Sequence, residues 1–341
     1  MPTTEAQVAY LLAFPNRTIL SPSPPERPQR LKDAPYFEVV DIDIRTIARE
    51  TVDVDGVRVL IRQQVYDRLI QSAECTFALA DALSSAALQT KSRIQATLRA
   101  RLTQGLTEAT GMIEEYSVLL LQRISDTPDQ YIEQNAAALA RFMRSQREIF
   151  DRTEIDEILS SRVRYSERDL TLIDWEGAIV IAPEGDFQSD VELMKIGNYQ
   201  LLRYRLLDET IERSLRTVSQ HLQEGSRPSL LPNRSKGVLR QAIEQRLSLL
   251  LDFEKIDQSL LLIGDWYTAK LYHIITDEFY LDEWKNTIKG KLESLESITQ
   301  IVQDNFTFSW TRLLELLQIV GWLVLLLGYF VLFFLDLRAH Q

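Results

Sequence analysis

The chain has 341 residues, of which 45% are hydrophobic and 26% are charged, an ordinary balance for a globular protein. This length has room for two domains, or for one domain plus an extended helical stalk. The formal net charge of −11 argues against a dedicated nucleic-acid-binding protein, which usually carries a basic balance. The single cysteine, Cys75, cannot form an internal disulfide, which argues against an extracellular fold stapled by disulfides.

The first sixty residues combine strand patterns with a proline-rich segment. Residues 8–14 are an apolar run closed by Pro15, which favours a strand over the end of a helix. Residues 15–35 contain a cluster of prolines, a composition typical of a loop or tether. Residues 36–61 are rich in β-branched residues, and Asp55-Gly56 stands between two short apolar segments. Because glycine tolerates a positive φ, this pattern predicts a β-hairpin.

The longest helical pattern runs over residues 63–124. Apolar residues recur there every three or four positions, and no proline interrupts them. Gly105 and Gly111 are the points where such a helix would bend or split. Pro128 ends the pattern, and residues 129–159 predict one or two further helices.

Three arginines lie three positions apart within the second of these helical segments: Arg141, Arg144 and Arg147. They share one helix face, which makes a phosphate-binding strip the functional interpretation. A solvated face is favoured, because no aromatic or glycine partners accompany the arginines.

Residues 162–181 return to strand composition in three short segments. The turn between the last two is Asp174-Trp175-Glu176-Gly177. We expect these strands to join those of the first sixty residues in one small sheet, because a lone hairpin is marginally stable in water.

From about residue 190 the pattern is helical, with helices over residues 193–222, 238–275 and 281–308. The last helix carries a heptad seam that suits helix–helix contact between chains and predicts a homo-oligomer. Packing of the same seam on residues 238–275 of its own chain is the alternative. The seam consists of Ile288, Leu292, Leu295, Val302 and Phe306.

Residues 316–335 are apolar except for Gln318, and as a helix they would span about 30 Å, the thickness of a bilayer's hydrocarbon core. We therefore predict a membrane-spanning helix, with a buried core helix as the alternative. Two glycines seven positions apart would let a second helix approach closely. The residues that define the anchor are Leu316, Gly321, Trp322, Gly328, Tyr329 and Leu335.

The start of the chain is not typical of a secretory signal, because residues 1–7 have no Lys or Arg and the apolar run that follows is short. The expected localisation is therefore a single-pass membrane protein, with the bulk of the chain facing the cytoplasm. The bilayer and further copies of the chain are the expected partners; protein partners remain open and nucleic acid is disfavoured.

No arrangement of residues typical of catalysis stands out. No two of the twelve glycines are closer than six positions, which argues against a Gly-rich phosphate loop. Three widely spaced histidines and one cysteine argue against a zinc site or a nucleophile–histidine pair. We therefore predict no catalytic residue, no cofactor and no metal.

Carboxylates gather at two places where acid–base or metal chemistry is the functional interpretation. Asp174 and Glu176 flank Trp175 in the predicted turn. A second group lies around Tyr280 and consists of Asp277, Glu278, Asp282 and Glu283. An ordinary turn and the acidic start of a helix explain the two groups without a function, and we favour these interpretations.

Five stretches, mainly in the C-terminal half, form a recognisable series: Arg164-Tyr165-Ser166, residues 172–178, residues 198–205, Gly264-Asp265-Trp266-Tyr267 and Leu281-Asp282-Glu283-Trp284. With the leucine-rich segment and apolar end that follow, their order resembles the "required for meiotic nuclear division" family. That resemblance implies a membrane-anchored protein with an α/β front and a coiled-coil, single-span back. It also implies an oligomeric scaffold, linked in mitochondrial members to organellar translation.

Together these features predict an α+β fold that is mostly α, with a small β-sheet head on long helices, a helical coiled-coil stalk and one C-terminal transmembrane helix. The predicted domains are a head at residues 1–187, a stalk at 188–312 and an anchor at 313–341. The favoured function is a non-enzymatic, tail-anchored scaffold that self-associates through its C-terminal helices. The alternatives are a membrane-bound hydrolase or metal-dependent enzyme that uses the acidic groups, and a membrane adaptor for RNA or ribosomes.

Overall fold

The computed structural model of the protein describes residues 5–16, 42–106, 111–124, 126–146, 148, 150–225, 247, 249–251, 253–254 and 266–339. The chain divides into two compact units. The first comprises Met1–Glu209 and Asp252–Ile288, and the second comprises Thr210–Leu251 and Lys289–Gln341. The domain boundaries expected from the sequence stay a prediction.

The first unit is built on a sheet of eight strands among the described residues, in the order β2-β3-β4-β1-β5-β8-β7-β6. Neighbouring strands are antiparallel except β5 and β8, which run parallel. The strands are β1 (Glu5–Pro15), β2 (Ile44–Val54), β3 (Val57–Tyr66), β4 (Ile70–Ala78), β5 (Glu114–Gln122), β6 (Arg162–Val163), β7 (Leu170–Ile173) and β8 (Gly177–Ile181).

The hairpin predicted at Asp55-Gly56 is confirmed and joins β2 to β3. Both turn residues have a positive φ, 52° at Asp55 and 79° at Gly56, which matches the twist of the paired strands. The predicted strand at residues 8–14 is β1, which lies in the sheet between β4 and β5.

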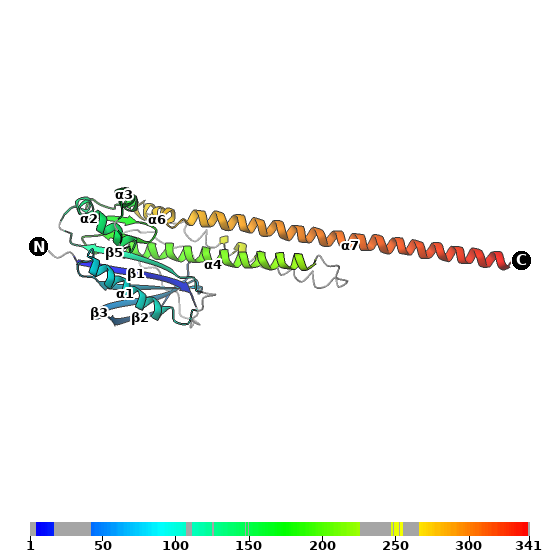
Figure 1. Ribbon diagram of the computed structural model, residues 1–341, viewed down its shortest axis with the longest axis horizontal. Coiled ribbons are helices and arrows are strands. Elements are labelled where there is room, and N and C mark those ends of the chain that lie inside the picture. Colours follow the sequence, from blue (N-terminus) through cyan, green and yellow to red (C-terminus); the bar gives the residue numbers. More distant parts are fainter. Residues whose placement is uncertain are drawn as a thin grey trace. The chain divides into compact units, whose positions relative to one another are not determined.

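Helices cover both faces of the sheet, because side chains alternate between the faces and most of them are apolar. One face packs against α1 (Ser85–Leu102), α2 (Pro128–Met143) and α3 (Arg152–Ile158), through residues such as Leu98, Phe142 and Ile158. Figure 1 shows α1 lying across the strands. Ser84 begins α1 by accepting a hydrogen bond from the Ala87 amide at 3.1 Å.

The opposite face packs against α4 (Gln188–Gly225) and α6 (Trp266–Glu278). Tyr199 of α4 stacks on Tyr66 of β3 with ring centroids 5.2 Å apart. On α6, the Tyr267 hydroxyl donates to Asp190 of α4 at 2.7 Å, and Thr171 of β7 donates to the same carboxylate oxygen. This second helical layer therefore depends on buried hydrogen bonds as well as on apolar packing.

The predicted long helix over residues 63–124 is wrong. Residues 63–78 belong to the β3–β4 pair, only residues 85–102 form a helix, and residues 114–122 form β5 in the middle of the sheet. The sheet is therefore much larger than the predicted small head, which corrects the expectation of a mostly helical fold class.

The predicted transmembrane helix is also wrong. Among the described residues, no helix has a stretch that is both long enough and apolar enough to cross a bilayer. The end of the chain belongs to α7 (Leu281–Ala339), whose described apolar side chains run over residues 317–332. Those sixteen residues span about 24 Å as a helix, less than the 30 Å or so of a hydrocarbon core. This finding overturns the tail-anchored scaffold function and the single-pass localisation.

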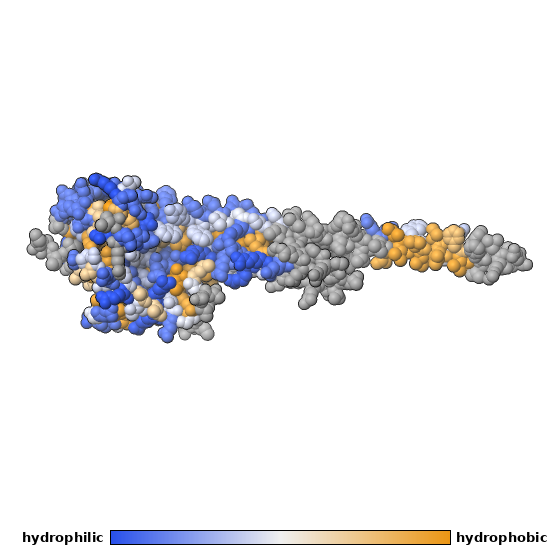
Figure 2. Space-filling view, viewed as in Figure 1, coloured by the Kyte–Doolittle hydropathy of each residue, from blue (hydrophilic) through white to orange (hydrophobic). Residues whose placement is uncertain are grey.

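The residues chosen as anchor and seam all lie on α7. Trp322 and Tyr329 are exposed, and a Cβ added at Gly321 or Gly328 would meet nothing within 4 Å. Figure 2 shows the continuous apolar surface of this part of α7. The Leu316, Leu335, Val302 and Phe306 side chains lie outside the described part of the chain.

Three seam residues, Ile288, Leu292 and Leu295, are buried within the single chain. In the second unit, Lys291 of α7 donates to Glu212 of α4 at 2.8 Å, so these two helices contact each other there. Self-association through the seam stays a prediction.

Candidate functional site

A cavity of about 330 Å³ lies in the first unit where β5 extends beyond the start of β8. β8 pairs with β5 only from Ser117 to Leu121, so β8 does not cover Glu114, Glu115 and Tyr116. The cavity is lined by Tyr10, Gln95, Glu114, Glu115, Tyr116, Ser117, Ser145, Trp175, Glu176, Asn198, Leu201 and Phe279.

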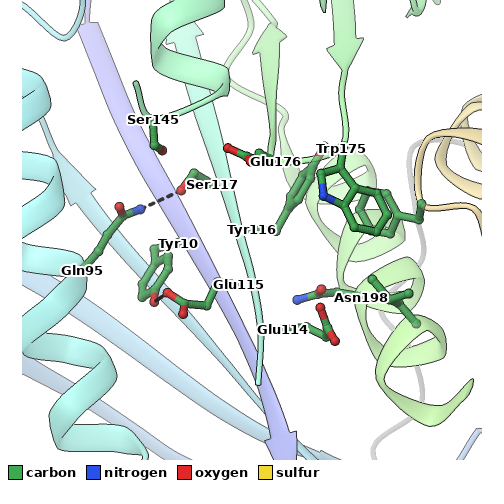
Figure 3. Close-up of a pocket in the computed structure, with 12 residues that line it drawn as sticks. Tyr10, Gln95, Glu114, Glu115, Tyr116, Ser117, Ser145, Trp175, Glu176 and Asn198 are labelled. Atoms are coloured by element: carbon green, nitrogen blue, oxygen red, sulfur yellow. Dashed lines mark hydrogen bonds between the residues drawn. The ribbon is translucent and has the colours of Figure 1, made fainter. Parts of the chain in front are cut away.

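Because successive side chains of β5 point to opposite faces, the cavity reaches both faces of the sheet (Figure 3). On the α1 face, the Gln95 amide donates to the Ser117 hydroxyl at 2.7 Å. On the α4 face, Arg205 pairs with Glu114. β5 thus contributes polar side chains to the cavity from both faces of the sheet.

Three carboxylates line the cavity, and none of the described residues that line it is Lys or Arg. Glu114 is buried, and burial raises its pKa, although Arg205 lowers it in part. Glu115 pairs with Arg99 at 2.8 Å and accepts a hydrogen bond from the Tyr10 hydroxyl. The cavity therefore presents negative charge that is balanced only from outside its lining.

Glu176 is the third carboxylate of the cavity lining. Its side chain is exposed, and partial burial nevertheless raises its pKa. Glu176 forms no ion pair within 4.0 Å among the described residues, in contrast to Glu114 and Glu115. In Figure 3 its carboxylate points to the side on which Ser117 and Ser145 lie.

Aromatic rings form much of the remaining wall. Tyr116 packs against Phe279 with ring centroids 4.9 Å apart, and the Tyr116 hydroxyl donates to the Asp174 carbonyl at 2.9 Å. Trp175 is 39% exposed and meets Tyr280 edge to face, with centroids 5.4 Å apart. The Tyr116 and Trp175 rings therefore each pack against a second ring beside the carboxylates.

The turn between β7 and β8 is tied to the end of α2. Arg144 contacts both carboxylate oxygens of Asp174, at 2.8 and 2.9 Å, and Asp174 is buried. At Gly177 a Cβ would lie only 2.8 Å from the Met143 carbonyl oxygen and 3.0 Å from that of Ser117. Glycine therefore allows the end of α2 to approach β8, and Ser145, two residues beyond Met143, reaches the cavity.

Behind the cavity wall lies Lys91, a lysine that is only 1% exposed. Its Nζ donates to the Ser145 Oγ at 2.8 Å and to the Phe142 carbonyl at 3.2 Å, and lies 4.1 Å from the centre of the Phe142 ring. Burial lowers the pKa of Lys91 to about 7, although the negative charge of Glu176 opposes this shift.

Ser145 occupies the first position after the cap of α2, with a φ of 52°. Its amide donates to the Phe142 carbonyl and the Gln146 amide donates to the Arg141 carbonyl, both at 3.2 Å. This is the Schellman arrangement of a helix end, in which glycine is the usual residue.

The structure brings the first predicted acidic group to the cavity and leaves the second elsewhere. Glu176 lines the cavity and Asp174 supports it. In the second group, Glu278 accepts a hydrogen bond from the Ser161 hydroxyl. Asp282 and Glu283 lie in the first turn of α7, where acidic residues interact favourably with the helix dipole, and Asp277 lies in the last turn of α6.

The arginine strip is not simply a solvated face, since Arg144 pairs with the buried Asp174. Arg141 donates to the Ala137 carbonyl of its own helix at 3.3 Å, and Arg147 lies outside the described residues. Within the described ranges, no three His, Cys, Asp or Glu residues are grouped so that they could hold a metal ion.

The sequence interpretation missed Lys91, Gln95, Glu114, Glu115 and Ser145. Lys91 had a detectable signal, because it lies at helical spacing between Leu88 and Ile94 on the buried side of α1. A single lysine in an apolar stripe indicates a buried amine. Nothing comparable marks Ser145, whose importance comes from contacts across 54 positions of the chain.

Two comparisons with known proteins find sequences similar to this chain. The sequence model described as "Uncharacterized protein MJ0711, N-terminal domain" matches residues 18–188, half of the chain. A curated relative, "Uncharacterized protein MJ0711" of Methanocaldococcus jannaschii, is 28% identical over 203 residues, which are 60% of this chain and 62% of the relative. The chain thus spans less than two thirds of that relative's length. No solved structure matches the chain. These matches overturn the resemblance to the "required for meiotic nuclear division" family.

Proposed function

Since the chain belongs to the MJ0711 N-terminal domain family, whose description states no activity, we propose from the chemistry of the cavity that the protein binds a small ligand carrying an amine or guanidinium group. The observation that carries the proposal is the lining itself. Glu114, Glu115 and Glu176 share one cavity with four aromatic rings, and its described lining contains no Lys or Arg.

Electrostatics favours a cation in this position. Charges interact more strongly where water is partly excluded, and Glu114 of the cavity lining is buried. Glu115 and Glu114 already have arginine partners, so Glu176 is the carboxylate best placed to receive a new positive group. The aromatic faces add a second attraction, since a cation over an aromatic ring gains about 0.5–2 kcal/mol.

The polar neutral groups would supply orientation. Gln95, Ser117 and Asn198 line the same cavity and offer hydrogen bonds to the uncharged part of a ligand. A volume of about 330 Å³ lies at the lower end of the range for small-molecule sites. The ligand class is therefore a compact amine or guanidine with at least one polar group.

The proposal is tested by titrating the protein with n-butylamine, butylguanidine and n-butanol and measuring binding by ligand-observed NMR. We expect the two cations to bind and the alcohol of similar size not to bind. Glu176→Gln should weaken cation binding about fivefold, the effect of one exposed charge pair.

The matched control is Glu184→Gln, which removes the same charge from an exposed residue that does not line the cavity. Equal binding of the alcohol and the amines, or equal weakening by both variants, would refute the proposal.

A further inference from the structure

We infer that Ser145 and Lys91 form an acyl-transfer pair, in which the Ser145 hydroxyl attacks the ester carbonyl of a substrate held in the cavity and Lys91 is its base. The inference rests on the proposed function in one respect: the ester substrate would carry the amine or guanidinium group that the cavity binds. The pair itself rests on separate observations on α1 and on the end of α2.

The first observation is the distance between the two groups. The Lys91 Nζ lies 2.8 Å from the Ser145 Oγ, within reach for proton transfer, and Ser145 lines the cavity. The base lies on the buried side of the nucleophile, so a substrate can approach Ser145 from the cavity side.

The second observation is that α2 does not need a lysine to complete its end. The Phe142 carbonyl already accepts a hydrogen bond from the Ser145 amide. Burying an amine is costly unless it is well paired, and an apolar side chain would fill the same space beneath Phe142. The Phe142 carbonyl and ring give Lys91 two partners at the end of α2, and Ser145 gives it a third that faces the cavity.

The third observation is the backbone of Ser145. A φ of 52° lies in the left-handed region, where a residue with a Cβ is less stable than glycine. Serine at this position keeps a hydroxyl that glycine would lack. Strained residues of this kind concentrate at functional sites.

The chemistry balances without a further reagent except water. The neutral Lys91 amine takes the Ser145 proton while Oγ bonds to the carbonyl carbon and the carbonyl electrons move to oxygen. The tetrahedral intermediate then expels the alkoxide, which takes the proton from Lys91 and leaves as an alcohol. Water attacks the acyl-Ser145 ester with Lys91 as base, and a carboxylic acid leaves as Ser145 regains its proton.

The charged surroundings suit a neutral base near pH 7. Because burial favours the uncharged amine, it lowers the pKa of Lys91 to about 7. Glu176, from the turn before β8, is the charged group that acts on Lys91, and Arg144 from the end of α2 acts in turn on Glu176. Protonation of Lys91 at lower pH would remove the base.

The test is covalent labelling with a fluorophosphonate, which reacts with activated serine hydroxyls, followed by intact mass and peptide mapping. We expect one adduct, at Ser145, with a rate that rises as pH increases through about 7. Lys91→Met should lower the rate at least about 100-fold, the usual contribution of a general base. Ser145→Gly should abolish labelling, and glycine adopts the positive φ of this position without strain.

Ser92→Ala is the matched control, because Ser92 is an exposed serine on the same helix as Lys91, and its hydroxyl donates to the Leu88 carbonyl. This variant should label like the wild type. Labelling that persists in Ser145→Gly, or that is unchanged in Lys91→Met, would overturn the inference.

Butylamine binding separates this inference from the proposed function. If the wild type binds butylamine but Ser145 is not labelled, the acyl-transfer pair is wrong and the binding proposal stands. If Ser145 is labelled but butylamine does not bind, the binding proposal is wrong and the pair stands.

Discussion

Lys91 couples the candidate site to the stability of the fold. Burial lowers its pKa from 10.5 to about 7, so between these values the unfolded chain binds a proton that the folded protein does not. Stability therefore rises with pH across this window, by at most about 1.4 kcal/mol per pH unit. Below pH 7 both states are protonated, and the full cost of burying the charge is present.

Replacing Lys91 by Met should consequently stabilise the protein. We expect a gain of about 1–4 kcal/mol at pH 6, as found when buried charged groups give way to apolar ones, and a smaller gain at pH 9. Urea unfolding of wild type and variant at several pH values measures this difference. If the gain in unfolding free energy does not shrink between pH 7 and 10, the pKa of Lys91 is not lowered by burial.

Cation binding should also depend on pH. Glu114 and Glu176 have raised pKa values, mainly through burial, so they become protonated at higher pH than ordinary glutamates. Lys91 gains a proton below about pH 7. Both changes remove attraction for a cation as pH falls, and butylamine affinity should decrease from pH 8 to pH 5. In the Lys91→Met variant, the part of the affinity decrease that occurs near pH 7 should disappear. If butylamine affinity falls with pH in the variant as it does in the wild type, protonation of Lys91 does not affect cation binding.

Gly177 is the residue that sets the distance between α2 and β8. A Cβ there would lie against two backbone carbonyl oxygens, which cannot rotate away as a side chain would. Gly177→Ala should therefore destabilise the protein by about 1–3 kcal/mol and weaken binding at the cavity. The control is Gly290→Ala on α7, where a Cβ meets nothing within 4 Å and alanine should stabilise the helix by about 0.5–1 kcal/mol. Thermal unfolding of both variants compares the two effects.

At the scale of elements, the segment of residues 63–124 explains what the sequence pattern could and could not predict. Ala73 and Phe77 are four positions apart, a spacing that places residues on one face of a helix and equally on one face of a strand. Both side chains are buried on one face of β4. A four-residue spacing alone therefore does not distinguish the two structures, and the absence of proline is compatible with both.

Local chemistry predicted other elements correctly. Asp55-Gly56 requires a positive φ, and the three short β segments at residues 162–181 form β6, β7 and β8 with the turn at Asp174-Trp175-Glu176. The candidate site was predictable only in that turn. Its other half comes from β5 and α1, which the helical prediction had merged, and from Ser145, whose partner Lys91 is 54 positions away. Contacts of that range leave no periodic signal.

At the scale of the whole molecule, the predicted homo-oligomer needs a surface other than the buried part of the seam, since Leu292 and Leu295 are covered within the chain. Residues 317–332 of α7 offer one, because their apolar side chains are exposed along the whole stretch (Figure 2). Contiguous exposed apolar surface of this kind marks interaction sites, and Gly321 and Gly328 would let another helix approach.

We therefore expect the protein to self-associate through this stretch. Changing Leu325 and Leu332, which are 69% and 68% exposed, to Lys should convert the oligomer to a monomer in sedimentation velocity experiments. Gln318→Lys adds charge at a polar position of the same stretch and should leave the oligomer largely intact. A wild type that sediments as a monomer would refute the prediction.

The parallel pairing of β5 with β8 has a consequence for how the protein folds. Ser117 pairs with Gly177 across sixty positions of the chain, whereas β3 and β4 meet through a tight turn. Closing the longer loop costs more chain entropy, so the β2–β3–β4 meander should form early and the β5–β8 ladder late. The cavity exists only once that late ladder is complete. A partly folded chain would then have formed its hairpins but would not bind the ligand. Ligand binding would therefore stabilise only the fully folded state and leave the earlier intermediates unchanged.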